Sequence, residues 1–214
     1  MKPRDFISTF TLMLCLFSCE PPATFTEPQP TGSVDLSKIP NKLQGEYLSL
    51  SDSSVLLINE SVIQRNIDYE VKTHLNQLGD NEQLLDDTLF NLTTHDKHPV
   101  KISGDSLVVS FHFIDTLFHI SKQNVLRKFK GVYFLNLLYD KKSWEVRKMQ
   151  LSKGELTVSN IKGQDDIKRL KEVAESIKDT VPPYEFTITR KQFRKFIKKE
   201  GFSQHETFVL QKKK

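Results

Sequence analysis

Glycine is scarce in this chain, and neither sign of charge dominates it. The 214 residues include 8 glycines, and 31 lysines and arginines are nearly balanced by 27 aspartates and glutamates, which gives a net charge of +4. So few glycines exclude collagen-like and glycine-rich repeat proteins and leave little room for a glycine-rich phosphate loop. The small positive excess gives no reason to expect nucleic-acid binding. With 37% hydrophobic and 27% charged residues, the composition excludes both a multi-span membrane protein and a disordered chain.

The N-terminus lacks a membrane-spanning run and is instead typical of an export signal. Lys2 and Arg4 precede an apolar run from Phe6 to Phe17. About a dozen residues suit the core of a signal peptide and are too few for a membrane span, which needs roughly 20. A buried first helix is the alternative, but three prolines within the ten residues after Cys19 disfavour it. We therefore expect residues 1–18 to be a signal peptide.

The only two cysteines lie at this end of the chain. Cys15 is inside the apolar run and would leave with the signal peptide. Cys19 follows Leu16, Phe17 and Ser18, an order that resembles the lipobox of bacterial lipoproteins, although Phe17 departs from the usual smaller residue. The resemblance implies that Cys19 is acylated and becomes the new N-terminus. The alternative, an ordinary cleaved signal, would leave a single thiol in an oxidising compartment.

Residues 19–38 are rich in proline and threonine. This composition predicts a semi-extended linker with a reach of about 3 Å per residue. Glu20 is the only acidic residue directly after the cysteine, so the acidic cluster that resembles a surface-export signal of Bacteroidota lipoproteins is missing. We therefore expect a protein of the bacterial cell envelope, anchored on the periplasmic side of the outer membrane. More than one acyl chain on Cys19 would make the membrane a stable partner.

The middle of the chain is dominated by short segments with alternating or continuous apolar residues. Their period and their content of β-branched and aromatic residues predict β-strands. The segments are 45–50, 55–58, 67–75, 106–114, 117–120, 131–139, 144–151 and 155–161. The turns at 103–105 and 153–154 are the strongest hairpin signals, and such short connections join antiparallel neighbours.

The C-terminal quarter changes to a helical period. It predicts helices near 164–178 and 190–200, each followed by a strand, at 184–189 and 202–210. The predicted fold is mainly β with an α+β C-terminus: an antiparallel meander forming an open barrel or a sandwich, with both helices packed on it. Residues 39–214 are expected to form a single domain. The basic helix at 190–200 has two interpretations, contact with anionic lipid or a solvated face opposite core-facing phenylalanines, and we favour the second.

Histidine offers two candidate clusters for metal or acid–base chemistry. His95 and His98 lie in a polar turn, and a hairpin around Asp115 would bring His112 near His119. A zinc site needs three or four ligands with further support, so a solvated turn and a half-exposed sheet face are the favoured interpretations.

Catalytic motifs are weak or missing. No Gly-x-Ser-x-Gly sequence is present, and Ser159 with Lys162 matches Ser-x-x-Lys without the partner motifs of penicillin-binding enzymes. We expect no enzyme, no catalytic residue, no metal and no cofactor.

Four triplets of aspartate, a hydroxyl residue and an aliphatic residue resemble the O-glycosylation signal of exported Bacteroidota proteins. The hydroxyl residues are Thr88, Ser106, Thr116 and Thr180. Turn chemistry before a strand explains the triplets about equally well, so both interpretations stay open.

The lipobox at residues 16–19, the linker, the β-rich domain and the basic C-terminus together resemble lipoproteins of the Bacteroidota type, a group defined by this architecture and not by an activity. The resemblance carries over no catalytic residue. We expect a binding or structural role in the cell envelope, with a protein or ligand partner. The alternative is a lipocalin-like or lipoprotein-carrier-like half-barrel with a deep apolar cavity. Five aromatic residues are candidates to line such a cavity or to fill a plain core: Phe111, Phe113, Phe118, Tyr133 and Phe134. An envelope hydrolase is a less favoured third hypothesis.

Overall fold

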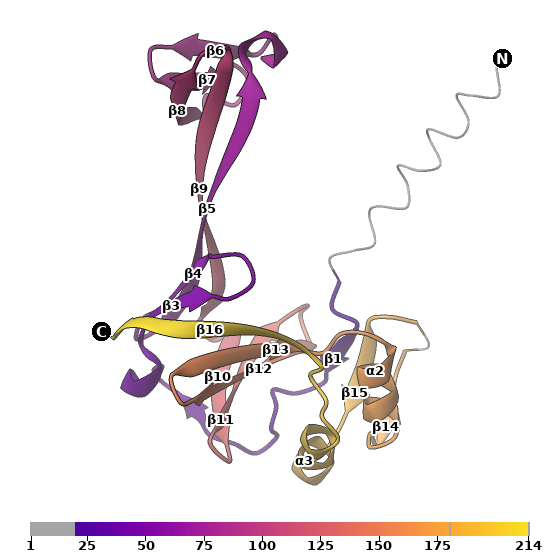
Figure 1. Ribbon diagram of the computed structural model, residues 1–214. Coiled ribbons are helices and arrows are strands. Elements are labelled where there is room, and N and C mark those ends of the chain that lie inside the picture. Colours follow the sequence, from indigo (N-terminus) through magenta and orange to yellow (C-terminus); the bar gives the residue numbers. More distant parts are fainter. Residues whose placement is uncertain (1–19, 180, 214) are drawn as a thin grey trace, which may run out of the picture. The chain divides into compact units, whose positions relative to one another are not determined.

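The computed structural model describes residues 20–179 and 181–213, so the signal peptide, Cys19 and Thr180 lie outside the described residues. Within this range the chain is mainly antiparallel β-sheet with two α-helices near its C-terminal end (Figure 1), which confirms the predicted fold class. The strands are β1 (Ala23–Phe25), β2 (Asp35–Leu36), β3 (Gly45–Ser49), β4 (Val55–Ile58), β5 (Val62–His74), β6 (Glu82–Leu85), β7 (Thr88–Asn91), β8 (Lys97–Ser103), β9 (Ser106–His119), β10 (Asn124–Phe129), β11 (Val132–Leu138), β12 (Trp144–Ser152), β13 (Glu155–Asn160), β14 (Ser176–Ile177), β15 (Tyr184–Thr187) and β16 (Gln204–Lys213). The helices are α2 (Gln164–Lys171) and α3 (Arg190–Lys198), with 3-10 turns η2 (Asn41–Leu43) and η3 (Leu75–Gln77).

The described residues form two compact units, where the sequence led us to expect a single domain over 39–214. Unit 1 comprises residues 20–37, 120–152 and 157–206, and unit 2 comprises residues 38–119, 153–156 and 207–213. Two of the boundaries between the units fall inside β13 and β16. Domain boundaries are recognised in a sequence by proline- or glycine-rich linkers. A boundary inside a strand has no such linker and therefore leaves no signal.

Unit 1 is built on an open sheet with the order β14-β15-β1-β12-β11-β10-β2, and β13 also neighbours β12. Most of its pairs are antiparallel, but β1 and β15 run parallel, with Ala23 opposite Tyr184 and Phe25 opposite Phe186. Because the strands are parallel, the residues before β1 and those before β15 enter the sheet at the same end.

The core of unit 1 is aromatic, and both helices contribute to it. Phe25 from β1 packs edge-on against Phe193 of α3, with ring centroids 6.1 Å apart, and Phe193 also packs against Phe134 of β11 at 5.1 Å. Helix α2 buries Ile167 and Leu170 in the same cluster. The helices therefore cover the sheet as predicted, and the phenylalanines of the basic helix α3 are core residues.

Helix α2 is shorter than predicted, because it ends at Lys171 and not near residue 178. The backbone that follows pairs with β15 instead: the Glu175 N–H donates to the carbonyl of Thr187, and the Lys178 N–H donates to that of Glu185. After Lys171, hydrogen bonds to β15 replace the hydrogen bonds of the helix. The helical spacing of apolar residues therefore continues in the sequence beyond the point where the helix ends.

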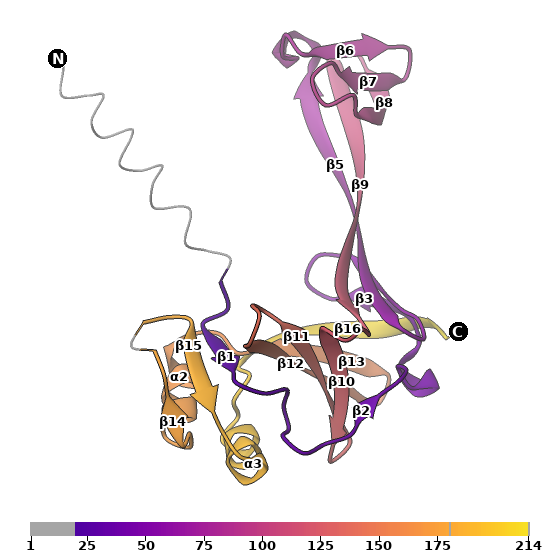
Figure 2. The same cartoon turned by 180° about the vertical axis from the view of Figure 1, so that it is seen from behind.

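The segment expected to be a linker, 19–38, is part of unit 1 over residues 20–37. Phe25 is 0% exposed in the core of unit 1, and Gln29 and Pro30 are also buried. Figure 2 shows this indigo segment running from β1 to β2 along unit 1. Proline is typical of an extended spacer, but it equally suits an ordered segment that pairs little of its backbone.

Unit 2 is an open antiparallel sheet with the order β16-β3-β4-β5-β9-β8-β7-β6. Its long strands β5 and β9 pair from Val62 opposite His119 to His74 opposite Ser106. We call β6, β7, β8 and the adjoining ends of β5 and β9 the head of unit 2. Both predicted hairpin turns are present: Gly104 and Gly154 have φ values of +63° and +86°, which glycine adopts without strain.

The predicted hairpin around residues 114–116 is wrong, because β9 is one continuous strand. The register against β5 shifts next to Ile63, where Phe118 and Thr116 face consecutive residues and Leu117 is the extra one. This bulge reverses which face later side chains occupy and buries Phe118. The same break in alternation looks like a turn when only the sequence is considered.

Candidate functional site

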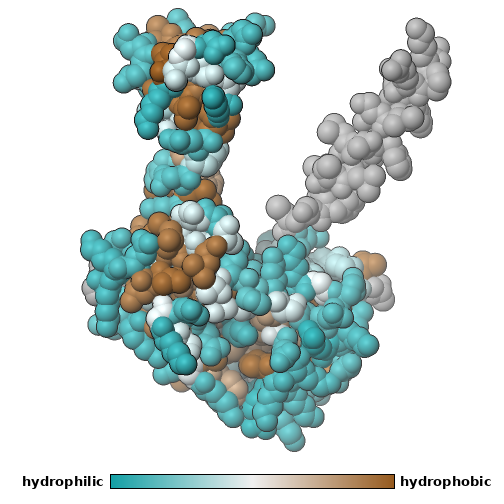
Figure 3. All heavy atoms as spheres, in the orientation of Figure 1, coloured by the Kyte–Doolittle hydropathy of each residue, from teal (hydrophilic) through white to brown (hydrophobic). Residues whose placement is uncertain are grey.

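An open hollow of about 730 Å³ lies on unit 2 where the long strands meet β8. It is lined by nine residues of β5, β8 and β9: Asp68, Tyr69, Glu70, Lys97, His98, Pro99, Ser110, Phe111 and His112. Figure 3 shows hydrophobic and hydrophilic residues side by side on the head. This mixture of rings and titratable groups makes the hollow the candidate binding site of the described residues.

Three of the lining residues carry rings that pack together on one face of the strands. Tyr69 and Phe111 are stacked, with centroids 4.9 Å apart and planes 11° from parallel. The His98 ring packs on Phe111 at 4.5 Å. Tyr69 is 50% exposed. The stack therefore presents part of an aromatic surface to solvent.

Paired polar side chains lie on the opposite face of β5 and β9 from the rings, because successive residues of a strand alternate between its two faces. His112 Nδ1 and Asp68 Oδ1 are 2.6 Å apart, and the Ser110 hydroxyl donates to Glu70 Oε1 at 3.4 Å. Lys101 Nζ lies 3.9 Å from the same Glu70 oxygen. All these side chains are at least partly exposed, so the pairs are solvated and contribute little to stability.

The register of β5 and β9 creates this arrangement. Tyr69 is opposite Phe111, Asp68 is opposite His112, and Glu70 is opposite Ser110. Directly opposed side chains are the closest neighbours in an antiparallel pair. Leu89, Val100, Leu107 and Val109 form the small hydrophobic core of the head, and Phe111 packs against this core.

The two histidine pairs considered as candidates in the sequence have separate surroundings. His112 and His119 lie seven residues apart on the single strand β9. His98 is in β8 on Phe111, while His95 is in the turn before β8. Among the described residues no three His, Cys, Asp or Glu side chains are grouped so that they could hold a metal ion.

The predicted glycosylation residues have different surroundings. Thr88 begins β7 and its hydroxyl donates to Asp87 at 3.4 Å, while Ser106 is buried at the start of β9. Thr116 is exposed within β9, and Thr180 lies outside the described residues. Burial argues against modification of Ser106 in the folded chain. Thr116 is the described residue of the four with the most accessible position.

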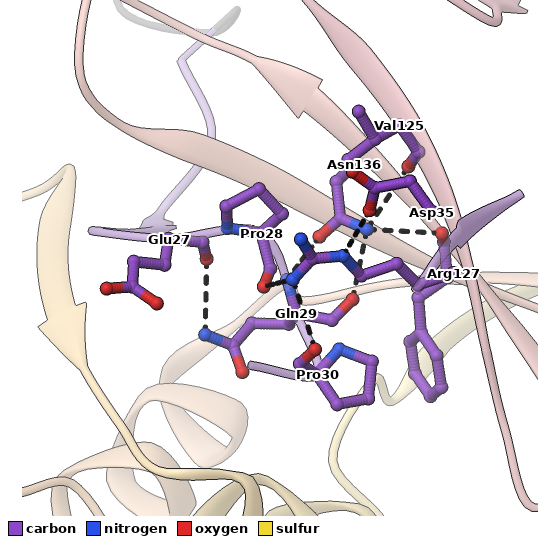
Figure 4. Close-up of polar contacts among 9 residues, drawn as sticks. Glu27, Pro28, Gln29, Pro30, Asp35, Val125, Arg127 and Asn136 are labelled. Atoms are coloured by element: carbon purple, nitrogen blue, oxygen red, sulfur yellow. Dashed lines mark hydrogen bonds and ion pairs between the residues drawn. The ribbon is translucent and has the colours of Figure 1, made fainter. Parts of the chain in front are cut away.

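A buried polar network in unit 1 fixes the segment that follows Cys19 (Figure 4). The Arg127 guanidinium donates to the carbonyls of Pro28 and Pro30, and its Nε lies 2.6 Å from Asp35 Oδ1. Asn136, which is 0% exposed, bonds both the N–H and the carbonyl of Gln29. Sequence reasoning missed these residues, because about 100 positions separate the partners and no local pattern links them.

The lipidation residue itself, Cys19, lies outside the described residues. Its place in the chain is informative, because β1 begins at Ala23, only four residues later. Neither α2 nor α3, the α-helices of the described part, is long and apolar enough to cross a membrane.

Comparisons with known proteins assign nothing further. No family model matches the chain, and no curated protein and no solved structure shows significant similarity to it.

Proposed function

We propose that this chain is a lipid-anchored protein of the bacterial cell envelope with a binding role, on the periplasmic side of the outer membrane. In this proposal acylated Cys19 holds unit 1 at the membrane, and unit 2 offers the hollow beside Tyr69 and Phe111 to a partner. The observation that carries the binding role is the aromatic stack of Tyr69 and Phe111, in which Tyr69 is half exposed.

The anchor is supported by the order of residues at the end of the export signal. Leu16 and Ser18 are placed as in a lipobox, and Cys19 would be the only thiol of the processed chain. Two or more acyl chains bury enough CH₂ groups, at about 0.8 kcal/mol each, for a stable attachment.

The binding role is supported by the exposed ring of Tyr69, which the fold does not need for its core. A core could be completed by Phe111 alone, yet Tyr69 leaves half of its surface exposed in the stack with Phe111, on which the His98 ring also packs. Rings with a few polar groups are the usual lining of ligand sites. Exposed tyrosine also recurs at protein interfaces, because it combines an apolar ring with a hydroxyl.

The half-barrel alternative has less support. Phe111, Phe113 and Phe118 belong to unit 2, whereas Tyr133 and Phe134 belong to unit 1. Phe118, Tyr133 and Phe134 are buried, and Phe113 is 57% exposed. These five residues therefore do not line one cavity within either unit.

The anchor is tested by comparing the two cysteines. Cys19→Ala should move the protein from the membrane to the soluble fraction, whereas Cys15→Ala, which changes only the signal peptide, should leave it membrane-bound. Mass spectrometry of the N-terminal peptide should show acyl groups on residue 19. Membrane attachment of Cys19→Ala that persists through a high-salt wash would contradict an acyl anchor.

The binding role is tested by what co-purifies with the detergent-extracted protein. Tyr69→Ala should lose the specific partner or ligand identified by mass spectrometry. Leu50→Ala, which removes another exposed apolar side chain of unit 2, should retain it. Identical sets of molecules from both variants and the unchanged protein would exclude the hollow as the binding site.

A further inference from the structure

The tether between the acylated residue and the folded body is far shorter than a proline-rich linker would make it. Residues 20–22 are the only ones between Cys19 and β1. At about 3.5 Å per residue, the Cα atoms of Cys19 and Ala23 are at most about 14 Å apart. This reach is about twice the polar layer of a bilayer, which adds roughly 5–7 Å on each side of the hydrocarbon core, so β1 begins within the headgroups or just outside them.

The buried network prevents the segment from lengthening this tether. Thr24 and Phe25 are buried, and beyond them Gln29 is bonded by Asn136. Peeling β1 from the sheet would expose Phe25 and break its parallel pairing with β15. The end of unit 1 at which β1 enters is therefore the end that faces the anchor.

Several exposed apolar side chains gather at this end. The Tyr184 N–H donates to the carbonyl of Pro22 at 3.1 Å, so the residues that precede β15 lie beside the tether. Val181 is 68% exposed and Tyr139 is 38% exposed, and both line one shallow hollow with Pro182 and Pro183. We call Pro21, Pro22, Tyr139, Val181, Pro182 and Pro183 the anchor-proximal surface.

The contact between Tyr139 and Glu20 joins this surface to the tether. Burial, the negative charges of Glu20 and Asp140 and a hydrogen bond with Glu20 all raise the pKa of the Tyr139 phenol. Glu20 is the residue directly after Cys19. The tyrosine ring therefore lies next to the point where the acyl chains would begin.

The composition of the surface suits the interface of a bilayer. Tyrosine favours the level of the lipid headgroups, where its ring is apolar and its hydroxyl meets water. Lys141 and Lys142 are exposed on the adjoining turn. Lys178 is paired with Glu185 at 3.1 Å, and Asp140, Asp179 and Glu185 line the same hollow, so the membrane contact depends on the apolar side chains and not on net positive charge.

We propose that the anchor-proximal surface of unit 1 rests in the headgroup layer of the membrane, so that this unit is held against the bilayer and is not displaced from it by a spacer. The inference rests on the proposed acylation of Cys19, which supplies the short tether. The occupant of the surface is the bilayer, and a protein partner or a second copy of the chain is an alternative outcome of the test.

The test uses the fact that the acylated, processed protein has no other thiol. Val181→Cys and Val34→Cys each introduce one, and a polarity-sensitive fluorophore is attached to it. Val34 is a matched control: it is 83% exposed, belongs to unit 1, and precedes β2 at the opposite edge of the sheet from β15. The lipidated proteins are reconstituted into phosphatidylethanolamine–phosphatidylglycerol vesicles that contain a lipid-borne quencher.

The outcomes separate the two proposals. Quenching of the label at residue 181 should exceed that at residue 34 by at least about twofold, because only the first enters the headgroup layer. If the proteins float with the vesicles but both labels are quenched equally, the membrane contact is wrong while the anchor stands. If the label at residue 181 is as shielded from water in detergent solution as it is in vesicles, a protein partner or a second copy of the chain covers this surface. That result also contradicts the membrane contact. If the proteins purified from cells carry no acyl groups and do not float with the vesicles, both the anchor and the membrane contact are wrong.

Discussion

Asn136 and Gln29 are joined by reciprocal hydrogen bonds, although 107 positions separate them in the sequence. The side-chain oxygen of Asn136 accepts from the Gln29 N–H at 2.5 Å, and its amide nitrogen donates to the Gln29 carbonyl at 3.0 Å. Both residues are buried. An amide side chain thus satisfies a stretch of backbone that pairs with no strand, which lets a proline-rich segment be part of unit 1.

Asn136→Ala should lower the free energy of unfolding of unit 1 by about 2–4 kcal/mol, because it leaves a buried N–H and a buried carbonyl without partners. Urea unfolding followed by the fluorescence of Trp144, the single tryptophan, reports on this unit. Gln29→Ala is the control, since it keeps the backbone groups that Asn136 bonds. An equal or larger loss for Gln29→Ala would show that the amide bonds are not what stabilises the segment.

Arg127→Ala should loosen residues 28–37 without unfolding the rest of unit 1. The guanidinium bonds two carbonyls of this segment and the carboxylate of Asp35, and lysine cannot reproduce that fork. Hydrogen exchange of a peptide spanning 28–37 should speed up at least about tenfold. Arg147→Ala is the matched control, because Arg147 pairs with Glu145 on its own strand and should leave the exchange unchanged. Unaltered exchange in Arg127→Ala would rule out this role.

Local patterns predicted those elements whose side chains alternate over several residues. Strands β3, β4, β11 and β12 follow directly from their apolar period, and the turn at Lys153 and Gly154 follows from glycine. Such signals are contained in a few neighbouring residues. These signals can therefore be recognised in the sequence without any knowledge of tertiary contacts.

Long-range pairing decided the features that could not be predicted. Proline content at residues 20–37 says nothing about Asn136 or Arg127, which hold that segment in place. The hollow of unit 2 depends on the register that sets Tyr69 opposite Phe111. Alternation alone leaves that register undetermined until two strands are aligned.

Asp166→Asn should destabilise unit 1 by about 2–4 kcal/mol. The Asp166 carboxylate is 0% exposed and accepts from the Lys162 N–H at 3.0 Å and from the Ser203 N–H at 2.9 Å. An asparagine presents a donor where an acceptor is required, and it also removes the partner of Arg169. Asp165→Asn, an exposed change in the same helical turn, should alter the free energy of unfolding measured with urea by less than about 0.5 kcal/mol. Similar midpoints for the two variants would contradict the role of Asp166.

Asp52 should make the stability of unit 2 depend on pH in the acid range. Burial by itself would raise the pKa of this carboxyl, but hydrogen bonds from Ser54 and Ser49 and the charge of Arg65 outweigh it and lower the pKa to about 2. The Arg65 Nη2 lies 2.8 Å from Asp52 Oδ2. A carboxyl whose pKa falls on folding stabilises the fold above its unfolded pKa of about 4 and loses that contribution as the pH falls towards 2.

Asp52→Asn removes this dependence, so the difference in stability between the unchanged protein and the variant should be full at neutral pH and shrink between about pH 4 and pH 2. Because Asp52 is 46% exposed, solvent screens the interaction and we expect at most about 1 kcal/mol at neutral pH. Urea unfolding followed by far-ultraviolet circular dichroism across this range measures it. Asp80→Asn, in an exposed turn of the same unit, is the control and should show a smaller difference at neutral pH. A difference that stays constant down to pH 2 would mean that the Asp52 carboxylate does not act through its ionised form.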